Sequence, residues 1–299
     1  MKAVYTMADL ADLPRDARLG VVGNPIAHSL SPPMQQAALD ADGRGLTYVR
    51  LLGEREGGDE QNLARLLAQL REVGFLGVNV TVPFKKAAYA LADEADALSQ
   101  LCGAANTLVF RGDKICCYNT DGPGFARAVQ ELCGRPLGQL RVLLLGACGG
   151  AGGALAAQAV LDGCPSLTLV NRPRPELEQL AELLRSRAKT TQVSALTFDA
   201  AELPQAVQES DLVVNATSLG LAAGDTMSPL PSELLRSGQV VYDIITHSTP
   251  LTRAAEARGC TVATGQSMLL WQGALAYERW FGVLPAVEEM RRALMAASA

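Results

Sequence analysis

Three polar clusters interrupt the apolar runs in the first half of the sequence. They are Asn24–Pro32, Asn79–Lys85 and Asn119–Gly122. Each lies at the carboxyl end of a predicted strand or just beyond it. Because ligands of open α/β sheets bind outside the carboxyl ends of the strands, we expect the three clusters to open on one cleft.

The side chains in these clusters suit the binding of an anion and the transfer of a proton. Ser29 and Ser31 could offer hydroxyl donors to an anionic oxygen, although helix capping explains two such serines equally well. Lys85 could exchange a proton with a bound ligand, and Asp121 could accept hydrogen bonds beside it. Taken singly, a helix-start charge explains Lys85 better, and a helix cap explains Asp121 better.

A glycine-rich segment follows an apolar strand in the second half of the chain. The strand, Val142–Leu145, leads into Gly146–Gly153, where five of eight residues are glycine, and then into an alanine-rich stretch. Glycines at a strand-to-helix turn let backbone N–H groups approach a pyrophosphate at a helix N-terminus. The strict G-x-G-x-x-G spacing is absent, but the pattern favours nucleotide binding over a plain flexible turn.

The end of the next predicted strand indicates which nucleotide is bound. NAD-selective folds place an acidic residue there, to bind the ribose 2′-hydroxyl. This chain has Asn171, Arg172, Pro173 and Arg174 instead. Because arginine carries a permanent charge and a fork of donors that suits a 2′-phosphate, we expect NADP. The alternative is that both arginines are ordinary surface charges.

Apolar runs of strand length alternate with stretches of helical period along most of the chain. In the first third we predict strands at Leu19–Gly23, Leu46–Leu52 and Gly77–Val82, and helices near Pro32–Ala41 and Glu60–Val73. An antiparallel hairpin is expected from Asn106–Phe110 and Lys114–Tyr118 around Arg111-Gly112-Asp113. In the rest of the chain we predict a helix at Pro123–Leu132 and final helices at Met268–Trp280 and Ala286–Ala297. Between them we predict strands at Arg141–Leu145, Leu167–Asn171, Val193–Phe198, Asp211–Ala216 and Val240–Ile244. This order predicts an α/β protein whose second half is a doubly wound nucleotide fold.

Length, composition and charge exclude several other classes of protein. A chain of 299 residues with 48% hydrophobic composition can fill two ordinary domains. The net charge of −5 argues against nucleic acid as a partner, and no apolar run is long enough to cross a membrane. His28 and His247 are the only histidines and have no clustered acidic partner, so we expect no metal. The seven cysteines show no CxxC spacing, which favours a reducing cytoplasm. Of the adjacent pair Cys116 and Cys117, we expect one in the core and one on the surface.

Six segments, taken in order, resemble the shikimate dehydrogenase family. They read GNPIAHSLSP, GVNVTVPFK, GAANTL, NTDGPGF, NATSLG and GQSMLLWQG, and they extend from about Leu19 to Trp280. The resemblance implies an N-terminal substrate-binding domain over residues 1–122, a Rossmann-like NADP-binding domain over 123–264, and C-terminal helices over 265–299 that return to the first domain. It also implies the NADPH-dependent reduction of 3-dehydroshikimate to shikimate in chorismate and aromatic amino-acid biosynthesis, by an oxidoreductase acting on a CH–OH group. We expect a monomer or a homodimer.

The resemblance assigns roles to particular residues. Lys85 and Asp121 are expected to be catalytic. Substrate binding is expected of Asp121 as well, and of Ser29, Ser31, Thr81, Asn106 and Gln272. Cofactor binding is predicted for Gly146, Ala147, Gly149, Gly150, Ala151, Asn171, Arg172, Arg174, Thr217 and Gly265.

Two departures from the family pattern leave alternatives open. Thr246 stands where the family has a tyrosine that helps to hold the substrate carboxylate, and the loop after it is about two residues shorter. The glycine loop also has one extra residue, best placed at Cys148. The altered loop motivates a quinate or aminoshikimate dehydrogenase of the same superfamily as the first alternative. A non-catalytic NADP-binding sensor is the second.

Overall fold

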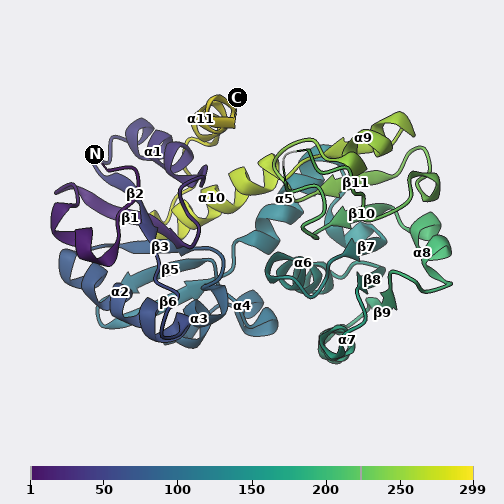
Figure 1. Cartoon of the computed structure of the whole chain (residues 1–299), viewed down its shortest axis with the longest axis horizontal. Helices are drawn as coiled ribbons and strands as arrows, with labels where there is room; N and C mark the ends of the chain where they lie inside the picture. The colour runs from purple at the N-terminus through teal and green to yellow at the C-terminus, as the bar shows by residue number, and fades with distance from the viewer. Residues whose placement is uncertain (1, 223, 299) are drawn as a thin grey trace. The chain divides into compact units, whose positions relative to one another are not determined.

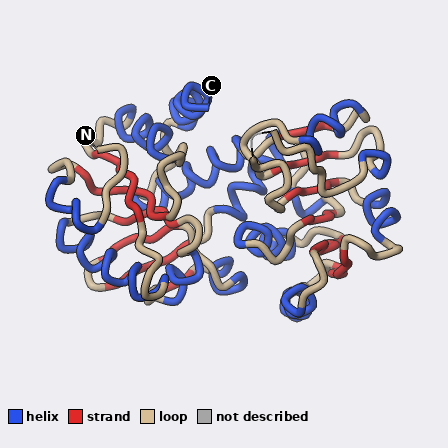
Figure 2. Tube along the Cα trace, viewed as in Figure 1, coloured by secondary structure: helices blue, strands red, loops and turns tan. Residues whose placement is uncertain are grey.

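The chain folds into two compact units, described here from a computed structural model that covers residues 2–222 and 224–298. Unit 1 comprises Met1–Thr120 and Gln272–Ala299, and unit 2 comprises Asp121–Trp271 (Figure 1). In each unit the strands form a central layer with helices on both of its faces (Figure 2). This architecture confirms the predicted α/β class.

Unit 1 contains a mixed sheet in the order β2-β1-β3-β5-β6-β4. Its strands are β1 (Ala17–Gly23), β2 (Thr47–Leu52), β3 (Gly77–Val80), β4 (Glu94–Ala95), β5 (Thr107–Arg111) and β6 (Lys114–Tyr118). Strands β2 and β3 both pair parallel with β1, and β5 pairs antiparallel with β3 and β6. The predicted hairpin is therefore confirmed, whereas the two-residue strand β4 was too short to show a pattern.

Helices cover both faces of this sheet. They are α1 (Ser31–Ala41), α2 (Asp59–Val73), α3 (Lys85–Ala90), α4 (Ala97–Cys102), α11 (Val287–Ser298) and the second part of α10 (Gln266–Phe281), together with the 3-10 helix η1 (Met7–Asp12). Helices α1 and α11 pack together on one side, and α2 and α3 lie on the other (Figure 1). Leu63, Leu67 and Leu70 of α2 repeat at helical spacing and are buried against the sheet.

Two expectations for unit 1 are wrong. Strand β3 ends at Val80 rather than Val82. Thr81 N makes the last bond to β1, to Val22 O (2.8 Å), and Phe84 N donates to Thr81 O (2.9 Å), which turns the chain away from the sheet. Cys116 and Cys117 are both buried, at 3% and 0% exposed. The reason is that β4 pairs with the outer side of β6, so β6 does not form the edge of the sheet.

Unit 2 contains a six-stranded parallel sheet in the order β12-β11-β10-β7-β8-β9. Its strands are β7 (Val142–Leu145), β8 (Ser166–Asn171), β9 (Gln192–Thr197), β10 (Leu212–Asn215), β11 (Val240–Asp243) and β12 (Thr261–Ala263). The order reverses between β7 and β10, where doubly wound sheets bind their ligands. The predicted nucleotide fold is confirmed, with β12 added at one edge.

The helices of unit 2 are α5 (Asp121–Cys133), α6 (Gly150–Leu161), α7 (Pro175–Arg187), α8 (Leu203–Glu209), α9 (Pro250–Ala257) and the first part of α10, with short 3-10 turns η2 (Leu137–Gln139) and η3 (Ser232–Leu234). Helices α8 and α9 bury Val207, Leu251 and Ala255 against one face of the sheet, and α6 and α7 lie on the other (Figure 1). No helix in the described ranges is both long and apolar enough to span a bilayer.

Candidate active site

The reversal of strand order in unit 1 lies at β1, which has β2 on one side and β3 on the other. The segments that follow β1 and β3 therefore lie next to each other. Asn24 N donates to Val82 O (3.0 Å). A Cβ atom on Gly23 would lie 2.4 Å from Cγ2 of Thr81, so only glycine fits there. Two of the three polar clusters meet at this point.

The loop that carries Ser29 and Ser31 is attached to the end of β2 at two places. Asn24 Nδ2 donates to Gly53 O (2.8 Å), and Arg50 Nη2 donates to Ser29 O (2.8 Å). Ser31 begins α1 and is 8% exposed, and its N–H donates to Ser29 Oγ (3.3 Å). The Ser29 hydroxyl is thus held at the first amide of a helix, where a negative charge is favoured.

A buried network of amides and hydroxyls lies at the start of β5. Asn106 Nδ2 donates to Thr120 Oγ1 (3.0 Å) and to Gln272 Oε1 (3.3 Å), and Thr120 N donates to Asn106 Oδ1 (2.8 Å). Asn79 Nδ2 donates to Thr107 Oγ1 (3.1 Å), and Tyr48 OH donates to Asn79 Oδ1 (2.7 Å). The structure therefore brings together Asn106 and Gln272, two residues predicted to bind the same substrate, although they lie 166 positions apart.

Sequence reasoning did not select Tyr48, Asn79, Thr107 or Thr120 as site residues. Asn79 and Thr120 lie inside the polar clusters, so the sequence held a signal for these two. Tyr48 and Thr107 lie within predicted strands, where a polar side chain gives no signal of its own.

Lys85 and Asp121 each begin a helix. Lys85 is half-buried at the start of α3, and its carbonyl oxygen accepts from Ala105 N (2.9 Å), next to Asn106 in the chain. Asp121 is 6% exposed, begins α5 and is the first residue of unit 2. Thr81 is half-buried in the turn that precedes α3.

The glycine loop of unit 2 is shaped by close backbone approaches. Gly146 follows β7 with φ 81°, and a Cβ atom there would lie 2.7 Å from Ala216 O, at the end of β10. A Cβ atom on Gly152 would lie 2.4 Å from Gly146 O. Gly149 caps α6, which leaves the first-turn amides of Gly150 and Ala151 without acceptors inside the helix. Ala147 is fully buried.

The end of β8 presents donors that fit a phosphorylated ribose. Asn171 is 8% exposed, and its buried Nδ2 has no oxygen or nitrogen acceptor, only the neighbouring Cys148 thiol. Arg172 and Arg174 are exposed, and Arg174 Nε lies 3.2 Å from Glu176 Oε2. Burial raises the pKa of the Cys148 thiol, the extra residue of the loop, and a side-chain interaction with Asn171 opposes that rise, so the thiol stays protonated.

A second buried network, which sequence reasoning missed, joins the loops after β10 and β11. Asp243 Oδ2 accepts from Asn215 Nδ2 (2.9 Å) and from Thr249 Oγ1 (2.7 Å), and its Oδ1 accepts from Ile245 N (3.0 Å). Asn215 Oδ1 accepts in turn from Thr217 Oγ1 (2.7 Å). Thr217, predicted to bind cofactor, is therefore positioned by this network.

Gly265, also predicted to bind cofactor, lies against the segment after β11. A Cβ atom there would lie 2.0 Å from Ile244 O, so the position requires glycine for packing whether or not a ligand binds.

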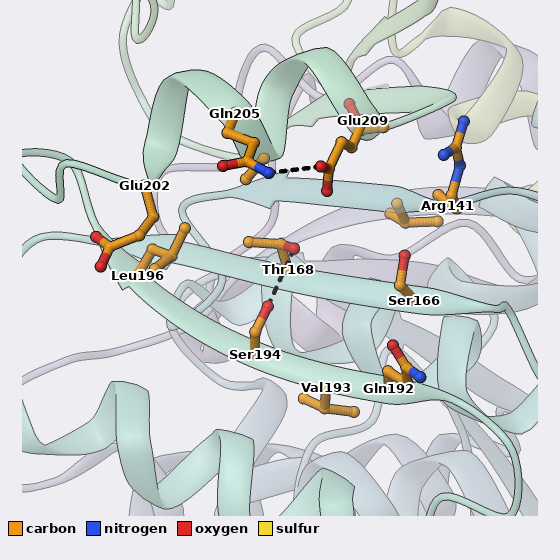
Figure 3. A pocket seen from close by; sticks show the side chains of 13 residues that line it. Arg141, Ser166, Thr168, Gln192, Val193, Ser194, Leu196, Glu202, Gln205 and Glu209 are labelled. Atoms are coloured by element: carbon orange, nitrogen blue, oxygen red, sulfur yellow. Dashed lines mark hydrogen bonds between the residues drawn. The ribbon is translucent and has the colours of Figure 1, made fainter.

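A hollow of about 470 Å³ lies elsewhere in unit 2 (Figure 3). Ser166 and Thr168 of β8, with Gln192 and Ser194 of β9, line it opposite Gln205 of α8. It shares no residue with the predicted site. In the part of the chain that the structure covers, no group of three or more His, Cys, Asp or Glu side chains could hold a metal.

Comparison with known protein families identifies two segments. The shikimate dehydrogenase substrate binding domain matches residues 21–108, and the shikimate 5′-dehydrogenase C-terminal domain matches residues 265–295.

Individual relatives are similar over nearly the whole chain. The shikimate dehydrogenase (NADP(+)) of Moorella thermoacetica is 39% identical over 281 residues, which is 93% of this chain and 92% of that protein. The crystal structure of shikimate 5-dehydrogenase from Thermus thermophilus, in complex with NADP(H) and shikimate, is 35% identical with a TM-score of 0.79, covering 94% of this chain and 99% of that one. Quinate dehydrogenase from Corynebacterium glutamicum, in complex with NAD, is 28% identical with a TM-score of 0.82, covering 93% and 98%. This chain belongs to the shikimate dehydrogenase family.

Proposed function

We propose that this chain is a shikimate dehydrogenase that reversibly reduces 3-dehydroshikimate to shikimate with NADPH, a reaction of chorismate and aromatic amino-acid biosynthesis. The observation that carries the proposal is the match to relatives named shikimate dehydrogenase (NADP(+)) over more than nine-tenths of the chain. The polar networks of unit 1 support it, because a small polyhydroxy acid needs many hydrogen-bond partners. Unit 1 is the proposed substrate domain, and unit 2 the proposed cofactor domain.

The proposed substrate residues divide by the chemistry of the group that they bind. Ser29 and Ser31 offer hydroxyl donors to the carboxylate. Asn106 and Gln272 each have an amide that can donate and accept, which suits a ring hydroxyl. Thr81 and Asp121 complete the set of groups for the hydroxyls.

The proposed cofactor fits the residues present in unit 2. Bound NADPH supplies a hydride. The first-turn amides of α6 suit its pyrophosphate, because they have no acceptor within the helix. The buried Nδ2 of Asn171, which has no oxygen or nitrogen acceptor in the structure, and the guanidinium groups of Arg172 and Arg174 suit a phosphorylated ribose. Thr217 and Gly265 complete the proposed binding surface.

The proton chemistry is proposed for Lys85 and Asp121. When the ketone oxygen gains charge, Lys85 donates the proton that converts it to a hydroxyl. Asp121 orients the lysine ammonium and a neighbouring ring hydroxyl by accepting hydrogen bonds from them. In the reverse direction, the lysine accepts the proton from the hydroxyl.

The buried thiols of the chain support a reducing cytoplasm as its place of action. Burial raises the pKa of Cys117 and of Cys164 to about 11, so both side chains remain protonated and behave as small apolar residues. Such a use of cysteine is usual where thiols stay reduced.

The test is a reduction assay at 340 nm with four combinations: NADP or NAD with shikimate or quinate. We expect the highest kcat/KM for NADP with shikimate. A higher value for quinate would establish the sister activity instead. Binding of NADP without turnover of either acid would leave only a cofactor-binding protein.

A further inference from the structure

Arg50 is a half-buried positive charge without a carboxylate partner. It lies in β2, in the unit that carries the proposed substrate residues, and no described Asp or Glu forms an ion pair with it. Its Nε is buried and has no hydrogen-bond partner in the structure. A buried donor without a partner costs about 1–3 kcal/mol, so the orphaned Nε of this guanidinium indicates an acceptor, and the missing counter-charge indicates an anionic one.

The guanidinium of Arg50 lies at the serine loop. Its Nη2 donates to Ser29 O (2.8 Å), and the amide of Ser31 donates to Ser29 Oγ (3.3 Å). The same side chain therefore fixes the backbone of the first serine and brings a permanent positive charge to the loop. The serine hydroxyls have no charge, so they cannot by themselves neutralise a carboxylate.

The neighbours of Arg50 in β2 define the direction in which it extends. Tyr48, two positions earlier and thus on the same face of the strand, donates to Asn79, which in turn binds Thr107 beside Asn106. Tyr48 also packs against Trp280 of α10. The face of β2 that carries Arg50 is therefore continuous with the polar networks of unit 1, and the opposite face carries the apolar Val49 and Leu51 of the core.

We propose that Arg50 is a substrate-binding residue that supplies the positive charge for the substrate carboxylate beside Ser29 and Ser31. The inference rests on the proposed function for the identity of the acid. It goes beyond that function in assigning the recognition of the negative charge to one guanidinium. It predicts that the enzyme distinguishes acids from neutral analogues through this residue.

The experiment compares shikimate with its methyl ester, which keeps the ring hydroxyls and lacks the charge. Arg50→Gln keeps a polar side chain with an amide donor but not the charge, and Arg50→Lys retains a charge. We expect Arg50→Gln to raise KM for shikimate by about 10- to 100-fold, the effect usual for a hydrogen bond to a charged group. For the methyl ester, kcat/KM of Arg50→Gln should equal that of the wild type, and KM for NADP should not change. The KM of Arg50→Lys for shikimate should lie between those of the wild type and Arg50→Gln.

Arg18 provides a matched control. It lies at the amino end of β1, whereas the serine loop follows the carboxyl end of that strand. Like Arg50, it donates from a guanidinium nitrogen to a backbone carbonyl, that of Ala17 (2.7 Å). Arg18→Gln should leave KM for both substrates unchanged. Equal losses for the acid and the ester in Arg50→Gln would overturn the proposal, because they would show that Arg50 only supports the loop. An unchanged KM for shikimate would overturn it as well.

Two further measurements keep the outcome decisive. Calorimetric titration of the wild type and Arg50→Gln with shikimate tests binding without turnover, so a failure of the proposed reaction is distinguishable from a failure of this inference. If Arg50→Gln does not fold, Arg50→Lys decides: a rise of KM for the acid alone supports the proposal, and an equal rise for acid and ester contradicts it.

Discussion

At the scale of single residues, the neighbouring lysines of α3 show what the fold adds to residue type. Lys85 is half-buried, and its backbone is hydrogen-bonded to Ala105, directly before Asn106. Lys86 is exposed. Both begin the same helix and carry the same charge, so only their surroundings distinguish a proposed proton donor from a solvated side chain.

Replacing Lys85 by methionine should lower kcat by a factor of about 10²–10⁴, the range usual for the loss of a general acid, with a smaller change in KM. Methionine keeps an unbranched side chain of nearly the same length and lacks the ammonium group. Lys86→Met is the matched control and should keep the wild-type kcat. Steady-state rates with shikimate and NADP measure both, and equal kcat values for the two variants would refute the assigned role.

At the scale of elements, the turn from β7 to α6 depends on two glycines with different surroundings. A Cβ atom on Gly152 would lie 2.4 Å from Gly146 O and 2.9 Å from Ala147 O, whereas one on Gly153 would meet only Ala147 O, at 4.0 Å. The first glycine is required by the close packing of the helix against the turn, and the second is not.

Gly152→Ala should therefore displace the loop, raise KM for NADP and destabilise the protein by about 1–3 kcal/mol. Gly153→Ala should bind NADP normally. Its free energy of unfolding should rise by about 0.5–1 kcal/mol, because alanine is more stable than glycine inside a helix. Urea unfolding and NADP titration of the pair measure both effects. If Gly152→Ala matched the wild type in both, the close approach would not control the loop.

The loops after β10 and β11 are joined by hydrogen bonds around the fully buried Asp243. Burial raises the pKa of the Asp243 carboxyl above its ordinary value of 3.8, against the opposing effect of the hydrogen bonds that it accepts. The native state then holds this proton more tightly than the unfolded chain does. The stabilisation from Asp243 is fully present below the unfolded-state pKa and is lost as the pH rises through the native pKa.

The contribution of Asp243 to the pH dependence of stability can be measured by comparison with Asp243→Asn, in which this side chain does not titrate. The difference in free energy of unfolding between the wild type and this variant should shrink as the pH rises from about 4 to about 8. Urea unfolding at a series of pH values gives this difference directly. A difference that grows with pH would show that the carboxyl has a lowered rather than a raised pKa.

At the scale of the whole molecule, the chain leaves unit 1 at Thr120 and returns to it at Gln272. The returning segment completes the core of unit 1. Gly273 lies against Met34 and Met290, since a Cβ atom there would lie 2.3 Å and 3.4 Å from their Cε atoms, and α11 packs on α1. Unit 1 therefore depends on residues from both ends of the sequence.

Met290→Ala should destabilise the protein by about 2–5 kcal/mol, because Met290 is 0% exposed and its loss leaves a cavity. Met295→Ala, five positions later in the same helix, should cost less than about 0.5 kcal/mol because Met295 is 62% exposed. Thermal unfolding of both variants tests whether α11 is part of the core. Equal melting temperatures for the two would show that it is not.

The sequence by itself determined the longer strands and helices and the family resemblance. Strands with continuous apolar runs, such as Val142–Leu145, and helices with leucines at helical spacing, such as α2, follow from local pattern, because the burial of one face needs only residue type and period. The roles of the glycines after β7 and of the arginines after β8 could also be predicted, because the cofactor of such a fold binds next to the ends of these strands.

Only the tertiary structure decided which polar residues meet. The pairing of Asn106 with Gln272, the carboxylate of Asp243 that joins two loops, and the uncompensated charge of Arg50 at Ser29 O all join residues distant in the chain. The burial of both Cys116 and Cys117 depended likewise on β4, a strand of two residues. Hydrogen bonds and burial depend on distances between side chains. For residues far apart in the sequence, those distances follow from the strand order of the sheet, which the spacing of residues along the chain does not give.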